Sequence, residues 1–153
     1  MTRSEKAIEN FMAGYNCSQA VSLAFADMLP IDEKTLSKLA CSFGGGIGRL
    51  REVCGALSGA VMVLSLLYGY DGPESGDIKL AQYEKVQTLA KRMEEKWETI
   101  ICRDLLGRVG HDDPKPDERT AEYYAERPCA RIVGDVAALL EDYIAELGEK
   151  ANA

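Results

Sequence analysis

Residues 53–70 constrain the fold most, because these eighteen positions contain no charged side chain. As a helix the segment would be about 27 Å long, close to the thickness of a bilayer core, so a transmembrane helix must be considered. Small and polar residues weaken that interpretation, namely Gly55, Ser58, Gly59, Ser65 and Gly69. We therefore expect a helix from about Arg51 to Tyr68, buried at the centre of a soluble protein, with no membrane span.

Two glycines of this segment, Gly55 and Gly59, are four residues apart and so share one helix face. The absence of side chains there predicts a groove in which a second helix approaches closely.

Capping and periodicity predict further helices along the chain. Asn16 and Asp32 are good N-caps, and Pro30 separates the two helices that they begin. The expected helices cover residues 4–14, 17–29, 32–41 and 76–100, one or two turns at 120–126, and the segment after Pro128. There is no alternating strand pattern, repeat or linker. We expect residues 1–153 to form a single all-α domain, an antiparallel bundle of about five main helices.

The composition excludes some partners. The 153 residues are 46% hydrophobic, which is typical of a globular chain, and the net charge of −7 argues against a nucleic-acid surface. Residues 1–10 contain no signal-peptide pattern, so a cytoplasmic location is expected. Thiols are reduced by default in that compartment.

The five cysteines are the residues that indicate chemistry. None belongs to a CxxC pair, and His111, beside Asp112 and Asp113 in a polar loop, is the single histidine, so the usual His-containing zinc sites are not expected. Four cysteines fall at or near predicted helix starts: Cys17, Cys54, Cys102 and Cys129. Helix N-termini and nearby arginines favour thiolates, so we expect lowered pKa values there. The fifth, Cys41, falls at a helix end, where the dipole disfavours a thiolate.

If the main helices alternate in direction, all five cysteines meet at one end of the bundle. The glycine-rich segment with Gly44, Gly45 and Gly46 falls at the same end, and it is expected to be a loop. It lacks the pattern of a P-loop, so its expected role is to end a helix and to pass close to the cysteines. Arg49 and Arg51 leave an anion site open as an alternative.

The sequence resembles the family named "putative redox-active protein" for its C_GCAxxG_C_C pattern. The resemblance covers nearly the whole chain and rests on Cys54-Gly55-Ala56-Leu57-Ser58-Gly59, the segment 14–21 around Cys17, Phe43-Gly44-Gly45-Gly46, the segment 102–107 that begins at Cys102, and Cys129. Cys41 is extra to the pattern. The family name implies redox activity, but it brings no substrate or reaction.

Three hypotheses about function remain. In the first, Cys17, Cys54, Cys102 and Cys129 are catalytic in thiol–disulfide exchange, which requires no cofactor, and Cys54, near Arg49 and Arg51, attacks an unidentified redox partner or small molecule. In the second, the same four cysteines bind zinc or an iron–sulfur cluster. In the third, the protein is a non-enzymatic helical module for interaction or small-ligand binding, in which the cysteines only pack.

Overall fold

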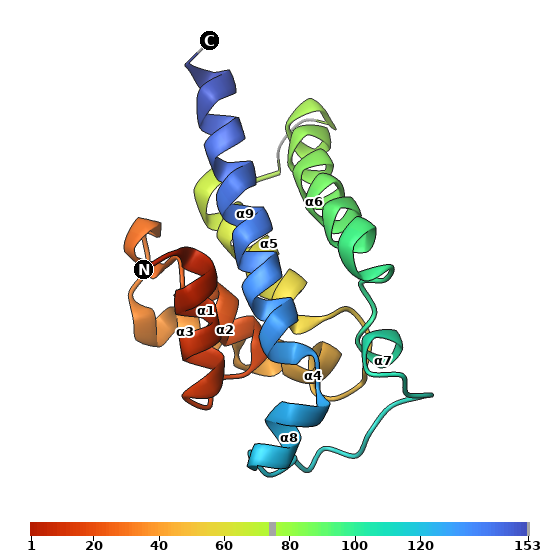
Figure 1. Cartoon of the computed structure of the whole chain (residues 1–153). Coiled ribbons are helices and arrows are strands. Elements are labelled where there is room, and N and C mark those ends of the chain that lie inside the picture. The colour runs from red at the N-terminus through yellow and green to blue at the C-terminus, as the bar shows by residue number, and fades with distance from the viewer. Residues whose placement is uncertain (74–75, 153) are drawn as a thin grey trace.

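The structure is a computed structural model that describes residues 1–73 and 76–152. Within these residues every regular element is a helix, which confirms the all-α class (Figure 1). The elements are α1 (Arg3–Met12), α2 (Cys17–Leu23), the short 3₁₀ helix η1 (Ala26–Met28), α3 (Glu33–Ala40), the 3₁₀ helix η2 (Cys41–Phe43), α4 (Gly44–Ile47), α5 (Gly55–Tyr68), α6 (Gly76–Trp97), α7 (Cys102–Leu105), α8 (Ala121–Glu126) and α9 (Cys129–Ala151).

The close contact between α2 and α5 fixes the centre of the molecule. A methyl group added at Gly59 would overlap the backbone of Ser18, and one added at Gly55 would overlap the sulfur of Cys17. The groove predicted from these two glycines is thus confirmed. The N-terminal part of α5 is buried around it, including Ala56, Leu57 and Ala60, whereas Ser65 near its C-terminal end is exposed.

Helix α5 begins later than expected, at Gly55 rather than near Arg51. The preceding residues are extended because they pair with the segment that leads into α7. The Cys54 N–H donates to the Ile100 carbonyl at 2.8 Å, and the Cys102 N–H donates to the Glu52 carbonyl at 2.6 Å. This pairing holds the starts of α5 and α7 side by side.

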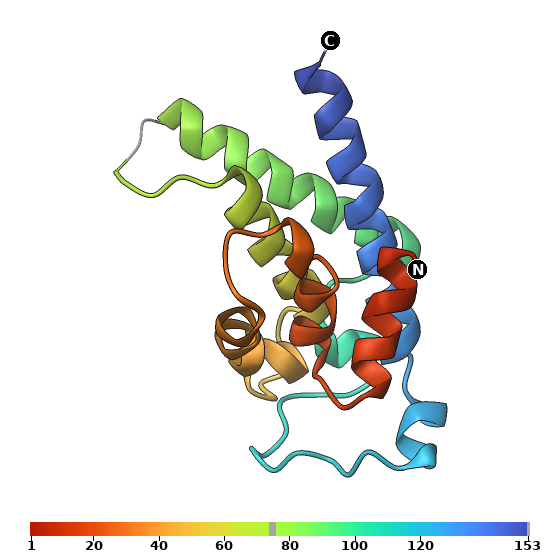
Figure 2. The same cartoon turned by 90° about the vertical axis from the view of Figure 1, so that its left-hand side faces the viewer.

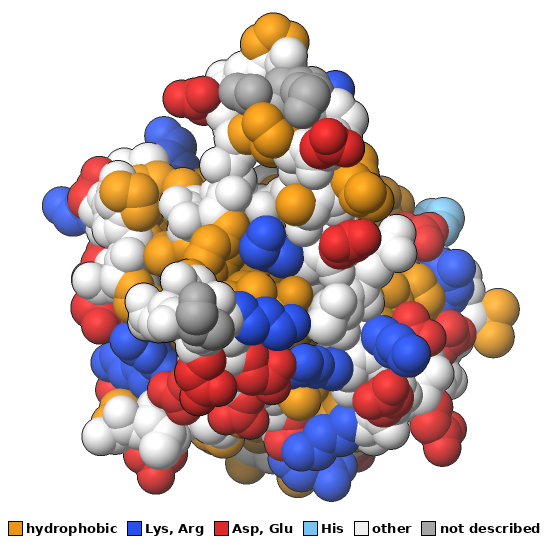
Figure 3. All heavy atoms as spheres, turned by 90° about the horizontal axis from the view of Figure 1, so that it is seen from above, with side chains coloured by type: hydrophobic (Ala, Val, Ile, Leu, Met, Phe, Trp, Pro, Cys, Tyr) orange, Lys and Arg blue, Asp and Glu red, His pale blue; other side chains and the backbone are white. Residues whose placement is uncertain are grey.

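A simple bundle of about five main helices is not confirmed. Helix α2 ends at Leu23 rather than Leu29, and the chain continues through η1. Helix α1 packs along α9, while α6 contacts both α9 and α5 and crosses α9 steeply (Figure 2). Viewed from above, acidic and basic side chains are intermixed around apolar ones (Figure 3). In the described part of the chain, no helix has the length and apolar character needed to cross a bilayer.

Candidate functional site

The four cysteines of the family pattern all stand at helix starts, as predicted. Cys17, Cys102 and Cys129 are the first residues of α2, α7 and α9, and Cys54 is the N-cap of α5. A local signal explains the start of α2, because the Asn16 side chain caps this helix by accepting from the Gln19 N–H at 3.0 Å. Cys41 lies at the C-terminal end of α3 and is exposed.

These helix starts surround one pocket at the lower end of the molecule in Figure 1, with a volume of about 400 Å³. All five cysteines line it, and all five are free thiols. The glycine-rich segment contributes Gly44, Gly45 and Gly48 to the same wall. The tertiary structure therefore brings together thiols that are up to 112 residues apart in sequence, Cys17 and Cys129.

The glycine-rich segment forms a left-handed turn, α4, rather than an irregular loop. Gly45, Gly46 and Gly48 have φ values of 66°, 67° and 53°, which glycine adopts without steric cost. A side chain at Gly46 would lie 2.7 Å from Cβ of Cys102. The predicted close passage of this segment beside the cysteines is therefore confirmed.

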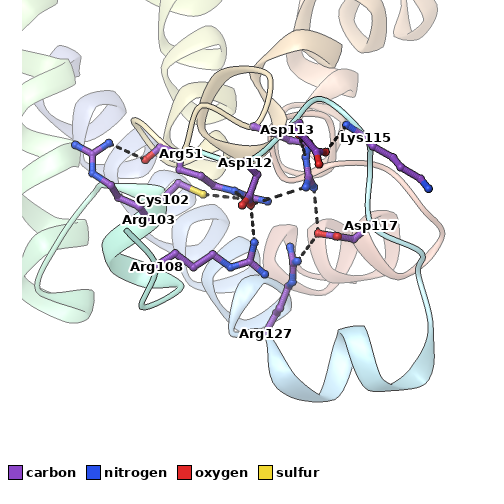
Figure 4. Close-up of polar contacts among 10 residues, drawn as sticks. Arg51, Cys102, Arg103, Arg108, Asp112, Asp113, Lys115, Asp117 and Arg127 are labelled. Atoms are coloured by element: carbon purple, nitrogen blue, oxygen red, sulfur yellow. Dashed lines mark hydrogen bonds and ion pairs between the residues drawn. The ribbon is translucent and has the colours of Figure 1, made fainter. Parts of the chain in front are cut away.

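Arg51 is a cation that contacts a thiol in this site (Figure 4). Its side chain is buried, with 3% of the residue exposed, and Nη1 donates to Cys102 Sγ at 3.5 Å. Nε of the same guanidinium donates to Asp112 Oδ2 at 2.8 Å. The sequence places Arg51 near Cys54, but in the described structure its guanidinium donates to Cys102, because Glu52 and Cys54 pair with the segment that leads into α7.

Arg49 holds the loop that closes the pocket. Its Nη1 donates to Asp117 at 3.0 Å and its Nε to the Asp113 carbonyl at 2.7 Å. Arg127 also donates to Asp117 (Figure 4). Residues 108–118 are thereby tied to the segment that follows α4 and to the C-terminal end of α8. No sequence signal identified Asp112 or Asp117 as part of the site, because a carboxylate in an irregular loop carries no motif.

Burial raises the pKa values of three thiols. The pKa of Cys54 lies well above its ordinary value, that of Cys17 is raised, and that of Cys129 is raised to about 12. Loss of hydration is the largest cause in each case, and a charge on a neighbouring thiol adds to it. N–H groups of Gly45 and Ala56 act in the opposite direction on Cys17 and Cys54 but do not outweigh burial. The expectation that helix starts lower the pKa values is wrong for these three thiols, including Cys54.

The described side chains do not form a metal-binding cluster. In residues 1–73 and 76–152, no three His, Cys, Asp or Glu side chains come together in an arrangement that could hold a metal ion. His111 is exposed in its loop, as expected. The four cysteines share a pocket, but their donor atoms do not fit zinc or a cluster in this arrangement.

The fold and the pocket define an all-helical protein with cysteines at the starts of four helices around a common cavity. Residues 15–143 match the family described as "Putative redox-active protein (C_GCAxxG_C_C)", and the chain belongs to this family. Neither a curated protein nor a solved structure matched the chain.

Proposed function

We propose that this protein carries out thiol–disulfide exchange and that Cys102 is the attacking thiol. The observation that carries the proposal is the contact between Arg51 and Cys102 in a pocket that three other family cysteines line. A thiolate is the nucleophile in such exchange, and a guanidinium group at the sulfur stabilises its negative charge. This role replaces the one expected for Cys54.

The exchange transfers two electrons. The Cys102 thiolate attacks one sulfur of a partner disulfide, the partner's S–S bond breaks, and one partner thiolate leaves. A second cysteine then attacks Cys102 of the mixed disulfide, an intramolecular disulfide forms, and the second partner thiolate leaves. The two protons that the cysteines lose go to the two partner thiolates. The protein is oxidised from dithiol to disulfide, and the partner disulfide is reduced to two thiols.

We assign the second thiol to Cys17. Burial is the largest cause of the raised pKa values of Cys17, Cys54 and Cys129, and a charge on Cys102 adds to all three, but only for Cys17 is Cys102 the neighbouring thiol with the largest effect. Cys17 also accepts a hydrogen bond from the Gly45 N–H. Its raised pKa keeps it protonated until the mixed disulfide has formed. Cys54 and Cys129 are then available as a second pair in the same pocket.

The test uses the full chain with Cys41→Ser, which removes the exposed thiol outside the family pattern. After anaerobic purification, elemental analysis measures bound metal, and thiols are counted before and after mild oxidation with diamide. We expect no stoichiometric metal, a loss of two or four thiols that a reductant reverses, and a Cys102–Cys17 disulfide by peptide mapping. Stoichiometric zinc or iron, or a thiol count that oxidation leaves unchanged, would show that the proposal is wrong.

We further infer that residues 1–153 act as one domain and that the protein works in the cytoplasm. The first inference is supported by the buried residues of α1, α2, α5, α6 and α9, which pack in one common core. The second is supported by the chemistry, because a cycling dithiol needs a compartment in which it is reduced again.

A further inference from the structure

The pocket that holds the cysteines is positively charged, although the protein as a whole has a net charge of −7. The described charged residues on its wall are four arginines and one aspartate: Arg49, Arg51, Arg119, Arg127 and Asp117. Asp117 is shared, because it accepts from both Arg49 and Arg127. One carboxylate therefore serves two guanidinium groups.

The remaining two arginines, Arg51 and Arg119, have positive charge or hydrogen-bond donors that the described residues do not fully pair. Arg119 donates to the carbonyls of Phe11 and Tyr15 at 3.2 and 3.1 Å, and among the described residues it forms no ion pair with a carboxylate. Nη2 of Arg51 is buried without a hydrogen-bond partner in the described structure. Asp112, which partners Arg51, is itself shared with Arg108.

The thiols do not cancel this excess of charge. Burial raises the pKa values of Cys17, Cys54 and Cys129, so these three are neutral near pH 7. The sulfur of Cys102 is the one that accepts from Arg51 among the described residues. An anion in the pocket would supply the missing negative charge, in a site where burial strengthens electrostatic attraction.

The rest of the wall is apolar and suits an organic molecule. Its apolar side chains include ones from α1, α7 and α9 and from the loop 108–118: Phe11, Leu105, Ile132, Val133, Pro114 and Pro116. Arg119 stacks over the rings of Phe11 and Tyr123, with 4.5 and 5.0 Å to their centroids, so its guanidinium is held in place. A volume of about 400 Å³ lies within the range of small-molecule sites.

We propose that the pocket binds small organic disulfides that carry a carboxylate, with the carboxylate at Arg119 and the S–S bond at Cys102. This inference rests on the proposed thiol–disulfide exchange and specifies its substrate class. In each turnover the substrate S–S bond breaks, two substrate thiols are released, and one protein disulfide forms, so electrons and protons balance as described above. Arg119 contacts the substrate in this proposal but takes no part in the bond changes.

The experiment compares two aromatic disulfides in the reduced Cys41→Ser protein. One is 5,5′-dithiobis(2-nitrobenzoate), which carries a carboxylate on each ring, and the other is neutral 2,2′-dithiodipyridine. The measured quantity is the ratio of their second-order rate constants, since a general change in thiol reactivity affects both rates and cancels. Arg119→Gln removes the proposed contact, and Arg119→Lys retains its charge.

Arg92→Gln is the matched control, because Arg92 pairs with Glu146 between α6 and α9 and does not line the pocket. It changes net charge by the same amount. We expect Arg119→Gln to lower the ratio about fivefold through loss of one nearby charge, Arg119→Lys to restore part of it, and Arg92→Gln to leave it unchanged. Thermal unfolding verifies that each variant is folded.

The outcomes separate the two proposals. If neither disulfide oxidises the protein, the proposed function is wrong. If both disulfides oxidise the protein and the ratio of rate constants is the same in the Arg119 variants and Arg92→Gln, the proposed thiol–disulfide exchange is supported and the carboxylate site is wrong. If Arg119→Gln does not fold, the carboxylate site is tested instead by Arg119→Lys and by the dependence of the rate ratio on ionic strength. A ratio that does not fall with added salt would then refute the carboxylate site.

Discussion

Arg51 donates to the sulfur of Cys102 from a position 51 residues earlier in the chain, and Asp112 holds the other side of the same guanidinium. Burial by itself lowers the pKa of Arg51, but the contacts with Cys102 and Asp112 outweigh it, so the pKa lies above its ordinary value. Arg51 is therefore a permanent cation at the start of α7. This relationship distinguishes Cys102 from the other cysteines of the pocket and supports its proposed role in exchange.

Arg51→Gln should slow alkylation of Cys102 by iodoacetamide about tenfold at pH 7, because a charge-assisted hydrogen bond of about 1.5 kcal/mol is lost. The rate at each cysteine is measured by peptide mapping in the Cys41→Ser protein, with Arg92→Gln as the control. Because Arg51 is buried, Asp112→Asn provides a second variant that leaves Arg51 in place but weakens its anchor. An unchanged Cys102 rate in both folded variants would contradict the assignment.

Cys129 should resist alkylation at pH 8. Its pKa of about 12, compared with an ordinary value of 9.0, leaves a thiolate fraction about a thousandfold smaller than that of an exposed cysteine. The measurement follows the Cys129 peptide in the native reduced protein and in protein unfolded by urea. Equal rates in the two samples would show that burial does not protect this thiol.

The reduced protein should lose stability as the pH rises above about 9. In the unfolded chain the Cys129 thiol ionises near 9.0, whereas in the folded protein it stays protonated until about 12. The unfolded state thus binds fewer protons in this window, and the free energy of unfolding falls by up to about 1.4 kcal/mol per pH unit for such a thiol. Urea titrations between pH 8 and 10 measure the free energy of unfolding, which should fall less steeply with pH in Cys129→Ala than in the wild type.

Gly55→Ala should lower the free energy of unfolding by about 1–3 kcal/mol, because the added methyl group overlaps Cys17 Sγ and the Phe43 carbonyl. Gly148→Ala is the matched control in a helix, since nothing lies within 4 Å of its added methyl group. That variant should gain about 0.5–1 kcal/mol from helix propensity. Urea unfolding of both variants tests the packing of α2 on α5, and equal effects would contradict it.

Asp117→Asn should loosen residues 108–118, because Arg49 and Arg127 lose the carboxylate that they share. Amide hydrogen exchange at pH 7 should become faster in this segment, and Glu118→Gln is the control within the same loop. The contact with Arg49, followed by that with Arg127, lowers the pKa of Asp117 below 3.8. The stability difference from the wild type should therefore be complete above about pH 4 and decrease as the pH falls further.

Several features of the fold could be predicted because they depend on neighbours in sequence. The caps Asn16 and Asp32 begin helices as predicted, and α9 begins directly after Pro128. The start of α5 could not be predicted, because the residues before it pair with a segment that is distant in sequence, as in the hydrogen bond from the Cys54 N–H to the Ile100 carbonyl. Local propensity contains no information on such a pairing.

The sequence by itself determined that Cys17 and Cys129 stand at helix starts, because the cap Asn16 and Pro128 act within a few positions of the chain. It also determined the groove of α5, since Gly55 and Gly59 lack side chains wherever the helix is placed.

Only the tertiary structure decided which thiol meets a cation and which thiols are kept neutral. The guanidinium of Arg51 reaches Cys102 because Glu52 and Cys54 pair with the segment that leads into α7, and Asp112 accepts a hydrogen bond from Arg51 in a loop distant in sequence. The raised pKa values of Cys17, Cys54 and Cys129 follow from burial among helices that are remote in sequence. The hydration of a thiol and its distance to charged groups depend on this packing, so a local sequence pattern does not predict the pKa values.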